Sequence, residues 1–157
     1  MKIRLAVPVE AEECWNIRNQ AIRYGCKSSY DDAVIAAWTP EKMPESYRNV
    51  IVANPFFVIA ADGRLLATGY LDLSTGSIEA VFTLPQYTGK GLGSQIIEAI
   101  KSEARGRGFE QLTLSSTPNA QTFYEKHGFK LMQESMYPSA LAQAELRCME
   151  MSINLLG

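Results

Sequence analysis

A turn with three glycines carries the clearest chemical signal in this sequence, because residues 86–93 read Gln-Tyr-Thr-Gly-Lys-Gly-Leu-Gly. A short apolar run at 78–83 precedes the turn, and apolar residues recur at helical spacing over 92–104 after it. The first N–H groups of a helix lack internal partners and lie at the positive end of its dipole, so they attract anions. The Cβ atoms that would keep a phosphate away from these donors are missing at Gly89, Gly91 and Gly93. The turn therefore predicts a phosphate or pyrophosphate site.

Two familiar phosphate-binding motifs do not fit this turn. A Walker loop needs a Gly-Lys-Ser/Thr unit, and the chain contains none. The dinucleotide fingerprint needs Gly-x-Gly-x-x-Gly, but Ser94 stands where its last glycine would be.

A different pattern, Gln/Arg-x-x-Gly-x-Gly/Ala, does fit residues 86–91, and a second motif follows at 119–129. There Asn-x-x-x-x-Tyr-x-x-x-Gly-Phe is matched at every position. In this order and spacing the two motifs resemble those of the GCN5-related N-acetyltransferases, the GNAT family, over about residues 55–135. The resemblance implies an acetyl-CoA-dependent N-acetyltransferase, which moves an acetyl group to a primary amine of a small molecule or peptide by direct attack on the thioester.

The resemblance also implies which residues hold acetyl-CoA. The pyrophosphate is expected on the amides of the glycine turn, and the pantetheine arm is expected to pair with the preceding strand like an added β-strand. Lys90 is equally well explained as a solvated loop lysine, and Asn119 as a helix cap. The expected cofactor-binding residues are Val81, Phe82, Thr83, Thr88, Gly89, Lys90, Gly91, Leu92, Gly93, Ser94, Asn119, Phe123 and Tyr124.

Acyl transfer to an amine needs a base and benefits from an acid. An alkylamine with a pKa near 10.4 is almost entirely protonated at neutral pH, so a carboxylate or a water chain must remove its proton. Glu79, on the strand beside the expected thioester, is the best-placed acidic residue, although it also reads as solvent-facing. By resemblance Tyr124 protonates the leaving thiolate, and a backbone N–H near Phe82 is expected to stabilise the oxyanion. Tyr124 also falls in a plain core stripe of its helix.

The acceptor is less well defined by the sequence. In this fold the region after the first strand and the C-terminal hairpin wall the acceptor site. The candidates there are Arg23, Tyr30, Trp38 and Tyr137, and the alternative for Tyr30 and Trp38 is that they seal the core. His127, the only histidine, is expected to complement a helix C-terminus, and one histidine with scattered carboxylates predicts no metal site.

The bulk properties set the class of protein. A chain of 157 residues, 46% hydrophobic and 20% charged, predicts one globular domain over residues 1–157. The net charge of −2 gives no electrostatic footprint for nucleic acid or an anionic membrane. Three cysteines without a metal or redox spacing, and no signal peptide or membrane span, predict a cytoplasmic protein. Cys14 and Cys148 are expected in the core and Cys26 partly exposed. The resemblance allows a homodimer without requiring one.

The elements that must position these residues follow from periodicity and turn residues. The order of these elements predicts an α/β fold with a mixed central sheet. The resemblance implies that helices cover both faces of this sheet and that it is splayed, so that the strand before the glycine turn and the strand after its helix part to form a cleft. Residues 44–49 are expected to form a loop or a short turn of helix, and residues 136–143 a loop. Helices are expected at 9–25, 33–38, 92–106 and 118–127, and strands at 2–7, 56–61, 65–73, 77–83, 110–115, 129–137 and 147–155.

Two other functions remain open on the sequence alone. The first is a non-catalytic acyl-CoA-binding or regulatory module on the same fold. The second is an unrelated nucleotide-binding protein that shares only the glycine turn.

Overall fold

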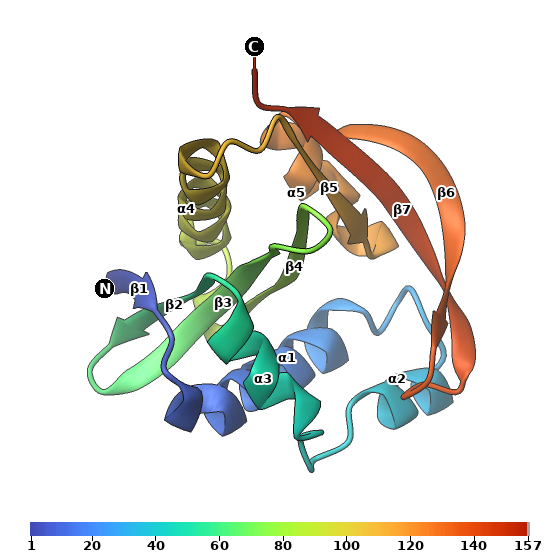
Figure 1. Cartoon of the computed structure of the whole chain (residues 1–157). Coiled ribbons are helices and arrows are strands. Elements are labelled where there is room, and N and C mark those ends of the chain that lie inside the picture. The colour runs from blue at the N-terminus through green and yellow to red at the C-terminus, as the bar shows by residue number, and fades with distance from the viewer. Residues whose placement is uncertain (157) are drawn as a thin grey trace.

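The computed structural model describes residues 1–156, and its centre is one seven-stranded mixed sheet in the order β1-β2-β3-β4-β5-β7-β6 (Figure 1). Only β4 and β5 run parallel, and all other neighbouring strands are antiparallel. The strands are β1 (Lys2–Leu5), β2 (Phe56–Ala61), β3 (Arg64–Asp72), β4 (Ser77–Thr83), β5 (Gln111–Ser116), β6 (Lys130–Ser139) and β7 (Ala144–Asn154).

Helices cover both faces of this sheet. α4 packs over β2, β3 and β4, and Figure 1 shows α1 and α3 across the sheet from it. The helices are α1 (Ala11–Gly25), α2 (Asp32–Trp38), α3 (Ser46–Ala53), α4 (Leu92–Gly106) and α5 (Gln121–Lys126), with 3-10 turns at Pro8–Glu10, Pro85–Tyr87 and Pro118–Ala120. The predicted mixed α/β architecture is confirmed.

Local signals located most of these elements well. The strands at 56–61 and 77–83 and the helix at 92–106 have the predicted bounds. The β2–β3 hairpin turns through Asp62 and Gly63, whose φ angles of 52° and 77° are the left-handed values that such a turn requires. Gly128 ends the α5 segment with a φ of 91°, as predicted for a C-terminal cap.

For residues 44–49 the sequence left a loop and a short turn of helix open, and the structure has a helix there. α3 spans Ser46–Ala53, because Ile51 on its inner face is buried against the core and this packing outweighs the helix-weakening residues nearby. The predicted loop at 136–143 was wrong over its first residues. β6 continues to Ser139 through Pro138, where a loop had been predicted. β6 lies at the edge of the sheet, where a proline that lacks an N–H donor is tolerated. The predicted strand at 2–7 ends early, at Leu5, and the predicted helix at 118–127 is split into a 3-10 turn and α5.

The inner face of α4 is the most deeply buried surface of any helix near the glycine turn. Leu92, Ile96, Ile97, Ile100 and Ala104 are each at most 1% exposed. Burial of each large aliphatic side chain contributes about 1.5–3 kcal/mol, so this stripe holds the first turn of α4 firmly against the sheet.

Gly69 on β3 lies directly beneath α4 and sets how closely the helix approaches. A Cβ built on Gly69 would lie 2.3 Å from Cγ2 of Ile96. We expect Gly69→Ala to lower the free energy of unfolding by about 1–3 kcal/mol, because the packed helix must move away. Urea unfolding monitored by circular dichroism measures this change.

Gly106, the last residue of α4, provides the matched control. A Cβ there would meet nothing within 4 Å. Gly106→Ala should leave stability unchanged or raise it, because alanine has the higher helix propensity. Equal effects of the two substitutions would contradict the close packing at Gly69.

Candidate active site

β4 and β5 part immediately after they meet. Their only paired residues are Ser77 and Thr113, and β5 then pairs along its length with β7. Within residues 1–156, the edge of β4 from Ile78 onward that faces β5 therefore has no strand partner. This confirms the predicted splayed sheet. An exposed strand edge of this kind can accept an extended ligand by strand addition.

A β-bulge on β4 was not visible in the sequence. Thr68 is opposite Phe82 and Tyr70 is opposite Glu79, so β4 carries an extra residue between these pairs. Ala80 adopts a φ of 54° at this point, and its carbonyl accepts a hydrogen bond of 2.8 Å from the buried Thr68 hydroxyl. The bulge changes which face the residues on either side of it point to. No glycine or proline in β4 announces it.

The glycine turn is open on its outer side. Gly89 and Gly91 have φ angles of 76° and 81°, and a Cβ built on either would meet nothing within 4 Å. The first helical hydrogen bond of α4 runs from the Gln95 N–H to the Gly91 carbonyl at 3.1 Å, so the amides of residues 92–94 precede the helical ladder. Thr88 closes the turn through its hydroxyl, which donates to the Pro85 carbonyl at 3.0 Å. An anion with several acceptor oxygens fits this corner.

Leu92 and Gly93 contribute to this corner through their backbone alone. The Leu92 side chain is 1% exposed and belongs to the core. A Cβ on Gly93 would lie 3.0 Å from the Phe123 ring. The missing side chain of Gly93 therefore makes room for Phe123 of α5 rather than for a phosphate, and it lets α5 pack against the start of α4.

The two predicted catalytic residues, Tyr124 and Glu79, lie within electrostatic reach of each other. Tyr124 is 8% exposed and packs edge-on against Phe123 and Phe129. Burial and the Glu79 charge raise the pKa of Tyr124, and no hydrogen bond from the described residues contributes to that shift. Tyr124 therefore remains protonated at neutral pH.

Glu79 occupies an environment that favours its neutral form. Burial raises the pKa of Glu79, and the charges of Asp72 and Glu150 raise it further, against a hydrogen bond with Ser77 that lowers it. A carboxylate whose pKa is moved toward neutrality is a stronger proton acceptor than an exposed one.

Tyr70 belongs to the same group and was missed by the sequence analysis. It is opposite Glu79 in the β3–β4 register and stacks on Phe56 at 5.2 Å between ring centroids. Burial raises the pKa of Tyr70. The charge of nearby Glu79 raises this pKa further, and so does Tyr137. Tyr137, which is 53% exposed on β6, comes from the C-terminal hairpin and lies near enough to Tyr70 to affect its pKa. A tyrosine in an otherwise apolar strand was the signal that could have identified Tyr70.

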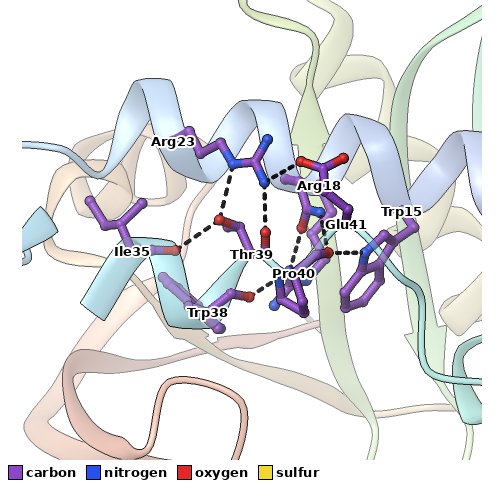
Figure 2. Close-up of polar contacts among 9 residues, drawn as sticks. Trp15, Arg18, Arg23, Ile35, Trp38, Thr39, Pro40 and Glu41 are labelled. Atoms are coloured by element: carbon purple, nitrogen blue, oxygen red, sulfur yellow. Dashed lines mark hydrogen bonds and ion pairs between the residues drawn. The ribbon is translucent and has the colours of Figure 1, made fainter. Parts of the chain in front are cut away.

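Arg23 holds α1 and the end of α2 together (Figure 2). Its guanidinium donates to the Thr39 hydroxyl at 3.0 Å, to the Thr39 carbonyl at 2.6 Å and to Glu41 at 2.9 Å. Beside it, the buried Arg18 donates to the Trp38 carbonyl at 3.0 Å. Arg23 therefore holds the Thr39–Glu41 segment against α1, and Arg18 holds the adjacent Trp38 carbonyl.

Trp15 and Asn19 of α1 complete this junction. Each donates to the Pro40 carbonyl at 2.8 Å, from the indole and the side-chain amide respectively (the Trp15 bond is drawn in Figure 2). The segment after α2 is therefore held along α1 by side-chain donors rather than by a core of its own.

Tyr30 and Trp38 form an aromatic pair next to the open strand. Their rings meet edge-on at 5.6 Å, and the Tyr30 hydroxyl donates to the Arg147 carbonyl of β7 at 2.6 Å. Both pack on a small buried cluster that Phe82 of β4 also touches. They therefore seal part of the core, as the alternative interpretation expected, and also lie close to the splayed strand.

Asn119 lies against the end of α1. Its side-chain oxygen accepts a hydrogen bond of 3.3 Å from Ser29, and neither 118–120 nor α5 has a side-chain cap. The helix-cap interpretation of Asn119 is therefore wrong.

Cys26, which the sequence predicted to be partly exposed, is 5% exposed, and burial raises the pKa of its thiol. Cys14 and Cys148 are buried, as predicted.

No helix within residues 1–156 is long and apolar enough to cross a membrane. The same range contains no group of three or more His, Cys, Asp or Glu side chains that could hold a metal ion. A hollow of about 270 Å³ lies away from the site, between α1 and the segment before α3, lined by Glu12, Trp15, Glu41, Lys42, Met43 and Glu45.

The chain matches the sequence profile of the acetyltransferase (GNAT) domain over residues 26–153. The chain belongs to the GNAT acetyltransferase family. An uncharacterised acetyltransferase of Streptococcus pyogenes serotype M1 is 34% identical in an alignment of 101 positions that covers 59% of this chain and 70% of that protein.

Solved GNAT structures share the fold. A GCN5-related N-acetyltransferase from Rhodopseudomonas palustris superposes with a TM-score of 0.88 at 20% identity, over 98% of this chain and 94% of that one. The PaiA N-acetyltransferase of Thermoplasma acidophilum, solved with coenzyme A, gives 0.79 at 19% identity over 98% of both chains. The predicted family, fold class and acetyl-CoA-dependent acetyltransferase class are confirmed. An unrelated nucleotide-binding protein is thereby excluded. The single domain, the homodimer and the cytoplasmic location stay predictions.

Proposed function

We propose that this GNAT protein transfers the acetyl group of acetyl-CoA to a primary amine of a small molecule or peptide. The observation that carries the proposal is the unpaired edge of β4, which leads into an open glycine corner at the start of α4. An extended pantetheine arm matches the strand edge, and a pyrophosphate matches the corner.

The cofactor-binding residues follow from this arrangement. The backbone of Val81, Phe82 and Thr83 would pair with the pantetheine arm, and Asn119 would bind it from α5's side. The amides of the corner and of the first turn of α4 would hold the pyrophosphate, with Lys90 adding charge from its exposed position. The corner residues in this set are Thr88, Gly89, Lys90, Gly91, Leu92, Gly93 and Ser94, and Phe123 supports the first turn from α5.

Bound acetyl-CoA supplies an acetyl group activated as a thioester. Glu79 accepts the proton of the incoming amine, because its half-buried carboxylate has a raised pKa. Tyr124 keeps its proton at neutral pH and transfers it to the leaving sulfur, so that coenzyme A departs as the thiol and the phenolate then regains a proton from solvent. Tyr30, Trp38 and Tyr137, with Tyr70 beside Glu79, line the acceptor side. Arg23 holds Thr39, the residue that follows Trp38, against α1.

Two measurements on the intact chain test this proposal. Coenzyme A at about 100 times its Kd should stabilise the fold by about 2.7 kcal/mol, seen as a rise in Tm, while ATP at equal concentration should not. With acetyl-CoA and a panel of amino sugars, polyamines, amino acids and peptides, we expect thiol release with at least one amine. No stabilisation by coenzyme A would overturn the proposal.

The alternative is a non-catalytic acyl-CoA-binding or regulatory module. It predicts the same rise in Tm but no thiol release with any amine of the panel. The half-buried Glu79 within electrostatic reach of the buried Tyr124 favours the enzyme, because a binding module has no need of a carboxylate with a raised pKa at this place.

A further inference from the structure

A chain of three hydrogen-bonded side chains joins the start of α4 to the end of α5. The Ser94 hydroxyl lies 2.9 Å from Nε2 of His127, and Nδ1 of His127 lies 3.3 Å from a carboxylate oxygen of Glu98. Ser94 is in the first turn of α4, where the pyrophosphate is proposed to bind. His127 and Glu98 have no part in the transfer chemistry, and the sequence analysis had read His127 as a helix-end residue only.

With His127 neutral, the direction of these hydrogen bonds is determined. The Glu98 carboxylate can only accept, so the proton of the neutral ring must be on Nδ1. Nε2 is then an acceptor, and the Ser94 hydroxyl must donate to it. In this state Ser94 turns only lone pairs toward the corner, and lone pairs repel the oxygens of a phosphate.

Protonation of His127 reverses the second bond. Both ring nitrogens then donate, so Nε2–H donates to the Ser94 oxygen and the hydroxyl proton becomes free. Ser94 can then donate to a phosphate oxygen at the corner. The ring also gains a positive charge near that phosphate.

The His127 side chain is 15% exposed. The charged groups that contact this residue come from α4: a carboxylate oxygen of Glu98 lies 3.3 Å from Nδ1, and Lys101 donates to the His127 carbonyl at 2.6 Å. From α5, the Phe123 ring lies 5.0 Å away and carries no charge. Although partial burial opposes its charge, hydrogen bonds and charges from Lys101 and His127 lower the pKa of Glu98, so Glu98 is a carboxylate at neutral pH.

We propose that the Glu98–His127–Ser94 chain couples binding of the cofactor pyrophosphate at α4 to the uptake of one proton by His127. His127 and Glu98 are positioning residues in this scheme, and Ser94 is the residue that contacts the phosphate. The proton comes from solvent and no covalent bond of the cofactor changes. The inference rests on the proposed function, because it needs the pyrophosphate at the start of α4.

Calorimetry with dephospho-CoA tests this coupling. This probe keeps the pyrophosphate but lacks the 3′-phosphate, whose own titration near pH 6 would obscure the result. Titrations from pH 5.5 to 8.5, in buffers of different ionisation enthalpy, measure both Kd and proton uptake. We expect net uptake of a proton and a Kd that weakens about tenfold as the pH rises through the histidine range, the effect of one charge-assisted hydrogen bond.

Substitution of each of the three hydrogen-bonded residues tests its separate contribution. His127→Gln keeps a side chain that can donate to Ser94 but cannot titrate, so both the proton uptake and the pH dependence of Kd should disappear. Ser94→Ala should bind at low pH only as weakly as the wild type binds at high pH. Glu98→Gln should move the midpoint to lower pH. Glu103→Gln, further along α4 where Glu103 pairs with Arg107 at 2.7 Å, is the matched control and should behave as wild type.

Nuclear magnetic resonance gives a readout that does not depend on activity. His127 is the only histidine of the chain, so tag-free protein shows a single imidazole. In the free protein at high pH its nitrogen shifts should report the Nδ1–H tautomer. Addition of dephospho-CoA should move the titration midpoint to higher pH.

The outcomes distinguish the two proposals. Binding of dephospho-CoA without proton uptake, or an Nε2–H tautomer in the free protein, overturns the coupling and leaves the proposed function intact. No binding at any pH overturns both. Thermal unfolding of each variant shows whether the fold is retained, and Glu103→Gln provides the reference.

Discussion

Replacing Tyr124 with phenylalanine should lower kcat about 100-fold and leave the affinity for coenzyme A nearly unchanged. The hydroxyl is the part of this buried side chain that can stabilise the leaving sulfur, and loss of one such donor typically reduces turnover by about 10²–10³-fold. The ring, which packs against Phe123 and Phe129, is preserved in the variant. Steady-state thiol release and calorimetry with coenzyme A measure the two quantities.

Tyr24→Phe is the matched control, because Tyr24 is 55% exposed on α1 and lies outside the proposed site. It should retain wild-type turnover. Intact turnover of Tyr124→Phe across the whole pH range would refute the role of the hydroxyl. If the affinity for coenzyme A fell together with turnover, the Tyr124 hydroxyl would have a role in binding the cofactor rather than in the transfer step.

Glu79→Gln should reduce kcat/KM by about 10²-fold or more at neutral pH, the range expected for a general base. The base must be deprotonated to accept the amine proton. Wild-type activity should therefore fall as the pH drops through the pKa of Glu79, which burial raises from its ordinary value. The measurement is a pH profile of kcat/KM with one accepted amine.

In the Glu79→Gln variant this fall in kcat/KM at low pH should be absent, because the amide does not titrate. Glu110→Gln, at an exposed position before β5, is the control and should keep the wild-type profile. If kcat/KM of Glu79→Gln fell at low pH as it does in the wild type, the amine proton would be taken up by water or by other groups of the site.

The sequence by itself determined the features that depend on neighbouring residues. The glycine corner, the helix over 92–106 and the hairpin turn at Asp62 and Gly63 follow from local backbone preferences and from 3.6-residue periodicity. The second motif at 119–129 located Tyr124 on its helix and Gly128 at the end of that helix. Because both motifs are local, the family and its cosubstrate were within reach of the sequence.

The tertiary structure alone decided which distant residues meet. The bulge at Ala80 depends on the partner strand, where Thr68 supplies the hydrogen bond that the strand ladder loses. Tyr70 joins Glu79 through strand register, and Arg23 is occupied at the α1–α2 junction. No periodicity encodes such contacts, because they arise from packing between elements that are far apart along the chain.

His127 shows the difference most clearly. As a residue it reads as a polar group at the end of a short helix, which any helix can tolerate. Its hydrogen bonds to Ser94 and Glu98 form only because Phe123 packs against Gly93, which brings the end of α5 beside α4. The sequence therefore determines which polar side chains lie on each helix. The close approach of two helices decides which hydrogen bonds form between them.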